Sequence, residues 1–396
     1  MPSRRLDGAT VALRADFNVP LTTGGEVADA ARIERTRPTI LHLALAGAKV
    51  AILSHLGRPG GREDPALTLE PVSRCLDDLL PVPVRFVPHS AGPEVEAAVA
   101  AMAGGSVLLL ENTRFLAGET ANDAELAAMW ATWADHFVLD AFGTVHRAHA
   151  STAGLPRAVR AKGGTAVAGR LVEREVAVLA GALQDPLRPF VAVLGGAKIS
   201  GKIDVIEALL PRVDALLVGG AMANTFLGAM GMETGASLVE TDRTEVAARV
   251  LGAAGIRLVL PVDCVAAPVI AAGAPTRVVD RAEIGPGEVV GDIGPVTVQL
   301  FGEYLAEAAT VVWNGPMGVF EVEDFAAGTV GVARAAAEAG DRGATVIVGG
   351  GDSAAAVREA GLASRMGHVS TGGGASLDLL AGRELPGLTA LSSRRI

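Results

Sequence analysis

Short runs of apolar, often β-branched residues recur along the chain, and each is followed by a polar or glycine-rich turn and then by a stretch of helical period. Strands that alternate with helices build parallel sheets whose two faces the helices cover. The pattern therefore predicts an α/β fold. Strands are expected at 10–13, 49–53, 84–87, 107–110, 137–140, 190–194, 215–218, 258–260, 310–313 and 345–348. Helices are expected at 31–46, 94–102, 121–134, 169–183, 203–210, 244–254, 296–308 and 325–339.

The length of the chain indicates two domains. Its 396 residues exceed the roughly 250–300 at which single hydrophobic cores stop growing. We expect two doubly wound parallel-sheet (Rossmann-like) domains joined by a hinge helix. The glycine-rich segment 162–169 precedes a long helical stretch and marks the boundary. The expected limits are 1–168 for the first domain, 169–184 for the hinge helix and 185–381 for the second domain.

Composition excludes several classes of function. The formal net charge is −10, whereas proteins that bind nucleic acid gather Lys and Arg to neutralise phosphates. No apolar run reaches the 18 residues of a membrane span, and the N-terminus lacks a signal sequence. The cysteines Cys75 and Cys264 lie far apart and outside any CxxC spacing, which argues against a disulfide or metal site. We expect a cytoplasmic protein that binds neither nucleic acid nor membranes.

Basic and polar side chains follow the expected strands of the first half. In open α/β sheets, ligands bind beyond the carboxyl ends of the strands. Arginine binds phosphate through two parallel hydrogen bonds, and Asp or Asn can bind hydroxyl groups. The first half therefore predicts a site for a small phosphorylated acid. The side chains in these turns are Arg14, Asp16, Asn18, His55, Arg58, Arg114, His146, Arg147 and His149.

Glycine dominates the corresponding turns of the second half. Glycine lets the backbone approach a phosphate or a purine, and helix N-termini attract phosphate oxygens. The segment 196–203 resembles a P-loop, but Ile203 stands where the metal-binding Ser or Thr should be, so that interpretation fails. Lys198 and Lys202, two of only four lysines, remain one helical turn apart. Asp352 either caps a helix or contacts a nucleotide-bound Mg²⁺, and the sequence leaves both readings open.

Nine motifs, in order along the chain, resemble those of phosphoglycerate kinases. The resemblance runs from about residue 6 to the end of the chain. A chance match of this many ordered motifs is negligible. The motifs are RADFNVP (14–20), SHLGRP (54–59), ENTRF (111–115), DAFGTVHRAHAS (140–151), VLGGAKISGK (193–202), VGGAMANTF (218–226), WNGPMGVFE (313–321), VGGGDS (348–353) and HVSTGGGAS (368–376).

The resemblance implies roles for matching positions. In the first domain, 3-phosphoglycerate or 1,3-bisphosphoglycerate would be held by Asp16, Asn18, Arg32, His55, Arg58, Arg114 and Arg147. In the second, ADP or ATP would be held by Gly195, Gly196, Lys198, Lys202, Gly219, Gly220, Asn314, Glu321, Gly350, Gly351, Asp352 and Ser353. Asp352 would also contact Mg²⁺, and Arg32 and Lys198 would be catalytic. A monomer is implied, with the tail 382–396 packing back on the first domain.

The implied reaction is direct phosphoryl transfer, which depends on positioning and charge neutralisation more than on acid–base chemistry. We expect no covalent enzyme intermediate, and a hinge that closes during turnover. Two alternatives are open. A dehydrogenase with tandem nucleotide-binding folds would need a GxGxxG turn, and no expected strand is followed by one. A non-catalytic binding protein would be expected to lose the charged positions of one site, and here both sets are present.

Overall fold

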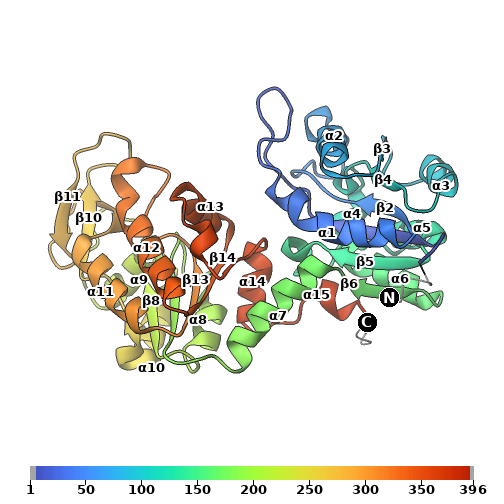
Figure 1. Cartoon of the computed structure of the whole chain (residues 1–396). Helices are drawn as coiled ribbons and strands as arrows, with labels where there is room; N and C mark the ends of the chain where they lie inside the picture. The colour runs from blue at the N-terminus through green and yellow to red at the C-terminus, as the bar shows by residue number, and fades with distance from the viewer. Residues whose placement is uncertain (1–5, 393–396) are drawn as a thin grey trace. The chain divides into compact units, whose positions relative to one another are not determined.

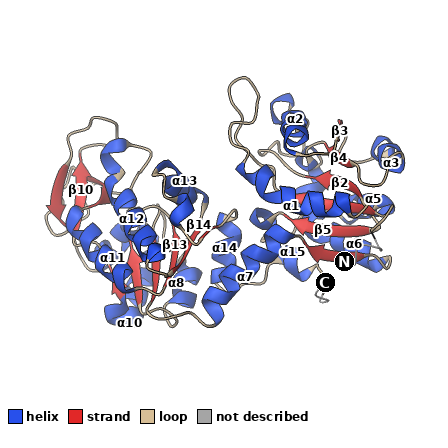
Figure 2. Ribbon diagram, in the orientation of Figure 1, coloured by secondary structure: helices blue, strands red, loops and turns tan. Residues whose placement is uncertain are grey.

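The computed structural model describes residues 6–392. The chain divides into two compact units, the first comprising Met1–Ala177 with Glu384–Ile396 and the second Val178–Arg383. Each unit is a parallel sheet flanked by helices (Figures 1 and 2). The predicted fold class, two doubly wound α/β domains, is confirmed.

The sheet of unit 1 has six parallel strands in the order β3-β4-β2-β1-β5-β6. The strands are β1 (Thr10–Ala15), β2 (Lys49–Leu53), β3 (Val84–Val87), β4 (Val107–Leu110), β5 (His136–Asp140) and β6 (Thr165–Ala168). The α-helices are α1 (Ala31–Leu45), α2 (Glu70–Leu79), α3 (Pro93–Ala100), α4 (Ala117–Ala121), α5 (Ala124–Trp133), α6 (Leu155–Ala161) and α15 (Pro386–Thr389). Shorter helical turns are η2 (Pro65–Leu67), η3 (Thr113–Phe115), η4 (Phe142–Thr144) and η5 (Ala150–Gly154).

The core of unit 1 explains why its central strands are almost wholly apolar. β1 and β4 are buried along their whole length, and β2 is buried from its second residue on. Strands of a parallel sheet are covered on both faces, so both sets of alternating side chains must be apolar. Helices α1 and α2 contribute Ile33, Ile40, Val72 and Leu76 to this core. Burial therefore fixes the strands, and the turns that follow them are free to carry charge.

The main sheet of unit 2 is built the same way, with the strand order β15-β14-β13-β7-β8-β9. Its strands are β7 (Phe190–Leu194), β8 (Ala215–Val218), β9 (Leu258–Val259), β13 (Thr310–Asn314), β14 (Thr345–Gly349) and β15 (His368–Val369). Its helices are α8 (Ile203–Leu209), α9 (Ala221–Ala229), α10 (Thr244–Ala254), α11 (Pro295–Glu307), α12 (Ala327–Asp341), α13 (Gly351–Glu359) and α14 (Gly373–Leu380). Helical turns are η6 (Thr241–Arg243), η7 (Gly255–Arg257), η8 (Glu323–Phe325) and η9 (Ala363–Arg365).

A second, antiparallel sheet in unit 2 was not predicted. It has the order β11-β10-β12, with β10 (Asp263–Ala267), β11 (Arg277–Asp280) and β12 (Val289–Ile293). Three of the four residues of β11 are exposed, and the pairing of β10 with β12 shifts register between Val265 and Ala266. An exposed strand and an irregular pairing leave no regular period in the sequence to detect.

Two other segments differ from expectation. The glycine-rich segment 162–169 was expected to be a connection, but it contains the edge strand β6, whose small residues pair with β5. The helix expected at 121–134 is two helices, α4 and α5. Asn122 between them takes a left-handed conformation, and the Asp123 side chain caps α5 by accepting from Leu126 N–H at 2.7 Å. A left-handed residue ends a helix, and Asp is a favoured cap of the next one.

Helix α7 (Arg170–Gln184) contains the point at which the two units divide. The predicted limits of a hinge helix at 169–184 stay a prediction. Residues 384–392 of the predicted tail belong to unit 1, where Gly387 N–H donates to Val145 O and Ser392 N–H to Ala166 O, both at 2.8 Å. Residues 393–396 of that tail lie outside the described residues. Between residues 6 and 392, no helix combines the length and apolarity needed to cross a bilayer.

Candidate active site

The turns after β1, β2 and β4 bring predicted side chains together in unit 1. Arg32, in the first turn of α1, places Nη1 2.7 Å from Oδ2 of Asp16. His55 Nδ1 lies 4.0 Å from Oδ1 of the same carboxylate. Asn18 accepts a hydrogen bond from Gly57 N–H at 2.8 Å, and Arg114 Nη1 donates to Gly57 O at 2.6 Å. Five of the predicted acid-phosphate residues therefore form one hydrogen-bonded group.

A buried arginine completes this group. Arg14 is 0% exposed although it lies within β1. Its Nε donates to Ser151 Oγ at 2.7 Å, its Nη2 donates to His55 Nδ1 at 3.0 Å, and its Nη1 donates to Ala15 O. We call Arg14, Asp16, Arg32, His55 and Arg114 the basic cluster.

The basic cluster is electrostatically prepared for an anion. Burial and then the neighbouring charge of Arg14 hold the pKa of His55 well below its usual value, so the imidazole is neutral at physiological pH. Burial, Arg14 and Arg147 together lower the pKa of Arg114 to about 10. Arg114 Nε is buried and has no hydrogen-bond partner among the described residues. Repelling cations and an unused donor favour the binding of a negatively charged group.

The structure places two predicted residues less closely. Arg58 and Arg147 are exposed. Arg147 Nε contacts His146 Nε2 at 3.2 Å, and its charge acts on Arg114, so it lies at the margin of the basic cluster. No hydrogen bond or ion pair found among residues 6–392 ties Arg58 to the basic cluster. The two arginines are available to a ligand, but the fold does not fix them.

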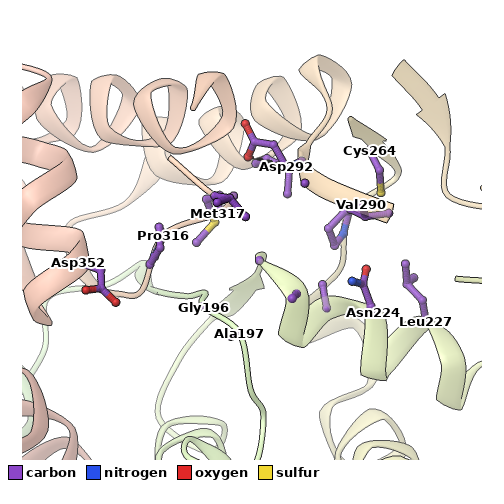
Figure 3. Close-up of a pocket in the computed structure, with 18 of the residues that line it drawn as sticks. Gly196, Ala197, Asn224, Leu227, Cys264, Val290, Asp292, Pro316, Met317 and Asp352 are labelled. Carbon is purple, nitrogen blue, oxygen red and sulfur yellow. Dashed lines mark hydrogen bonds between the residues drawn. The ribbon is translucent and has the colours of Figure 1, made fainter. Parts of the chain in front are cut away.

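Unit 2 contains two cavities that share lining residues, which we together call the glycine groove. The larger, of about 350 Å³, is lined by both predicted lysines and by Asn314 and Ser353. The smaller, of about 200 Å³, has a mostly apolar lining that includes Leu227, Val290 and Met317, with Asn224 and Glu321 as polar groups (Figure 3). Residues common to both are Gly196, Ala197, Pro316 and Asp352. An apolar slot beside a cationic cavity has the amphipathic character of a nucleotide.

Close packing requires the glycines of the groove. Gly220 lines the smaller cavity with φ +68°, and a Cβ there would lie 2.5 Å from Gly196 N. At Gly195 a Cβ would lie 2.5 Å from Met317 Cε, and at Gly219 2.5 Å from Met317 Sδ. Gly350 has φ +100° at the start of α13, and Gly351 lines the larger cavity. The backbone itself thus forms much of the surface.

The two lysines have different settings. Lys202 is largely buried, and its Nζ donates to Gly195 O and to Asn314 O at 3.1 Å. Burial lowers the pKa of Lys202 to about 8, against the opposing effect of Asp352. Lys198 is exposed at the lining of the larger cavity. Asn314 Nδ2 is buried without a hydrogen-bond partner among the described residues. These donors could meet phosphate oxygens.

Asp352 fits a magnesium contact better than a helix cap. It lies in the first turn of α13, whose N-cap is Gly350, and no side chain caps that helix, so the capping interpretation is wrong. Among residues 6–392, no three His, Cys, Asp or Glu side chains are grouped as metal ligands. Mg²⁺ is commonly held by one or two carboxylates and by substrate phosphates. A single carboxylate that lines both cavities suits an ion that arrives with a nucleotide.

Several residues of the site had not been identified from the sequence. Glu119 and Ser151 lie beneath the basic cluster, and Cys264 and Asp292 line the smaller cavity. Glu119 and Ser151 are 32 residues apart, so no local spacing links them. Arg14 did carry a signal, since it is a charge inside an otherwise apolar strand.

Comparison with known proteins agrees with this architecture. The family model described as phosphoglycerate kinase matches residues 2–383. A phosphoglycerate kinase of Rubrobacter xylanophilus is 54% identical over 389 residues, covering 98% of this chain and 97% of that protein. One from Chloroflexus aggregans is 53% identical over 389 residues, covering 97% and 96%.

Solved structures are also similar. Phosphoglycerate kinase from Coxiella burnetii has a TM-score of 0.83 and 40% identity, covering 97% of this chain and 96% of that one. The enzyme from Pyrococcus horikoshii has a TM-score of 0.86 and 33% identity, covering 98% and 96%. These likenesses span both units, and they rule out the dehydrogenase alternative. The chain belongs to the phosphoglycerate kinase family.

Proposed function

We propose that this chain transfers a phosphoryl group reversibly from 1,3-bisphosphoglycerate to ADP, giving 3-phosphoglycerate and ATP. The observation that carries the proposal is the division of labour between two anion sites. The basic cluster presents guanidinium groups to a small acid phosphate. The glycine groove presents backbone, lysines and an apolar slot to a nucleotide. Membership of the family supports the same assignment.

The residues we propose for the acid phosphate are Asp16, Asn18, Arg32, His55, Arg58, Arg114 and Arg147. Those we propose for the nucleotide are Gly195, Gly196, Lys198, Lys202, Gly219, Gly220, Asn314, Glu321, Gly350, Gly351, Asp352 and Ser353. Gly195 and Gly219 act by leaving room for Met317 rather than by direct contact.

Transfer needs in-line positioning and neutral surroundings for the charge in flight, because the leaving group is a stable carboxylate. We assign charge neutralisation to Arg32 and Lys198, with backbone N–H groups at helix starts assisting. Asp352 would hold Mg²⁺ against the nucleotide phosphates, where the ion offsets their charge. No covalent nucleophile is needed. Because the substrates must meet, turnover requires a closed conformation, for which α7 is the segment that adjusts.

The test is a coupled assay of ATP formation from ADP and 1,3-bisphosphoglycerate with the purified full chain. Mg²⁺-dependent ATP formation is the expected result. Binding of both ligands without ATP formation would overturn the proposal and leave the non-catalytic alternative. A monomer in the cytoplasm is proposed as well, since each site is built from one chain and ATP is an intracellular substrate. Light scattering in solution tests the oligomeric state.

A further inference from the structure

A buried carboxylate lies beneath the basic cluster, and the proposed chemistry does not use it. Glu119, in α4, is 0% exposed. Its Oε2 accepts from Ser151 N–H at 2.9 Å, and its Oε1 accepts from Ser151 Oγ–H at 2.6 Å and from Thr113 Oγ1–H at 3.3 Å. His149 Nδ1 lies 3.9 Å from Oε1. A buried charge with several donors rigidly fixes the groups that surround it.

The partners of Glu119 lead to the residues that face the ligand. Ser151 Oγ donates to Glu119 and accepts from Arg14 Nε–H at 2.7 Å. Arg14 in turn donates from Nη2 to His55 Nδ1 at 3.0 Å. Thr113 directly precedes Arg114 within η3. One carboxylate therefore joins the turns after β4 and β5 to Arg14 in β1, and through Arg14 to the turn after β2.

The charge of Glu119 also offsets the repulsion within the basic cluster. Burial lowers the pKa of Arg14, and the charge of Glu119 is the main effect that opposes this. The same carboxylate opposes the lowering of the pKa of Arg114 and of His149. Cations this close would separate without a buried anion, so Glu119 keeps them charged and in place.

We propose that Glu119 is a positioning residue for the acid phosphate, which holds Arg14, His55 and Arg114 in their binding arrangement before the substrate arrives. This inference rests on the proposed function of the basic cluster. Preorganisation lowers the cost of binding, because the site does not have to assemble around the ligand. The carboxylate itself does not contact the substrate.

The direction of the effect separates positioning from simple charge. If Glu119 acted only as a charge, removing it would leave the basic cluster more positive and would tighten the binding of an anion. If it acts by positioning, Glu119→Gln weakens anion binding, since an amide cannot accept from every donor that the carboxylate satisfies. The two accounts predict opposite signs.

The experiment titrates the full-length Glu119→Gln protein calorimetrically with 3-phosphoglycerate and, separately, with ADP. We expect the Kd for 3-phosphoglycerate to rise about tenfold, in line with the loss of a charged hydrogen bond, and the Kd for ADP to stay within about twofold. In steady state, the KM for 3-phosphoglycerate should rise by more than kcat falls. The matched control is Glu125→Gln, an exposed glutamate in the first turn of α5, which should change neither Kd.

Unchanged or tighter binding of 3-phosphoglycerate would overturn the proposal, and so would an equal loss for both ligands. If Glu119→Gln does not fold, Ser151→Ala decides, because it removes only the hydroxyl that links Arg14 to Glu119. We expect about a threefold loss for 3-phosphoglycerate alone, and no loss contradicts the proposal. A wild-type chain that fails to bind 3-phosphoglycerate would instead refute the proposed function.

Discussion

The two units offer anion sites that are built in opposite ways. Unit 1 uses side-chain charge, with Arg14 fully buried and Arg114 largely so. Unit 2 uses the backbone, with Gly196 and Gly220 opening the groove and Lys202 tied to carbonyl oxygens. A site of clustered cations must be held together by a buried counter-charge, whereas a site of glycines must be kept free of side chains. The first should therefore be sensitive to lost charge and the second to added volume.

The largest expected effect is on turnover and tests whether each site contributes one catalytic cation. Arg32→Ala and Lys198→Ala should each reduce kcat by about 10²–10³, the scale seen when one preorganised donor to a transition state is removed. The coupled assay with saturating substrates measures this. Arg37→Ala, an exposed arginine on the same helix as Arg32, should keep normal turnover. Near-normal kcat in either test variant would remove that residue from the mechanism.

A second prediction concerns a buried acid at the edge of the groove. Burial raises the pKa of Asp292 to about 7, even though its oxygens accept from Ile293 N–H and Gly328 N–H. Because the folded-state pKa is raised, its stabilising contribution is complete below about pH 4 and is lost as the pH rises through 7. Relative to Asp292→Asn, the wild type should lose on the order of 2 kcal/mol between pH 4 and 8.

Denaturant unfolding of both proteins across this pH range measures the difference. A gap between wild type and variant that does not change with pH would show that Asp292 is ionised in the folded protein throughout.

A third prediction tests the sensitivity of the groove to volume. Gly220→Ala places a methyl group 2.5 Å from Gly196 N, so ADP binding should weaken about tenfold while 3-phosphoglycerate binding is unchanged. Gly361 is the matched control, since it has φ +70° and nothing within 4 Å of an added Cβ. Both variants should lose about 1–2 kcal/mol of stability from backbone strain. If Gly361→Ala weakens ADP binding equally, strain and not volume is responsible.

The smallest expected effect concerns the loop that carries Lys198. Glu240 accepts from Ser200 N–H at 3.0 Å and from Ser200 Oγ–H at 2.5 Å, which anchors this loop. Glu240→Gln should reduce kcat about threefold to fivefold, because a partly exposed hydrogen bond is worth about 1 kcal/mol. Glu245→Gln, on the exposed first turn of α10, serves as the control in the same assay. Equal rates for the two variants would show that the loop keeps its place without Glu240.

Most of the fold could be predicted where burial imposes a period on the sequence. The expected limits of β2, β3, β4, β7 and β8 agree with the structure residue by residue. Each is a short apolar run that a polar or glycine-rich turn ends. The antiparallel strands β10 to β12 escaped prediction because exposure and irregular pairing remove that period.

The site could be predicted only as far as its turns. Asp16, His55 and Arg114 follow strands of a parallel sheet, so topology alone brings them together. Glu119 and Ser151 could not be found this way, because their role depends on contacts between distant segments. Sequence patterns locate the groups that follow strands, and coordinates are needed for the groups beneath them.

The most direct test of direct transfer between two sites is the stereochemical course at phosphorus. ATP made chiral at its γ-phosphoryl group would be used to phosphorylate 3-phosphoglycerate with the full chain, and the configuration of the product would be determined. A single in-line displacement inverts the configuration, and inversion is the result we predict. Retention would mean two successive displacements through a phosphorylated enzyme, and it would contradict direct transfer from the glycine groove to the acid held by the basic cluster.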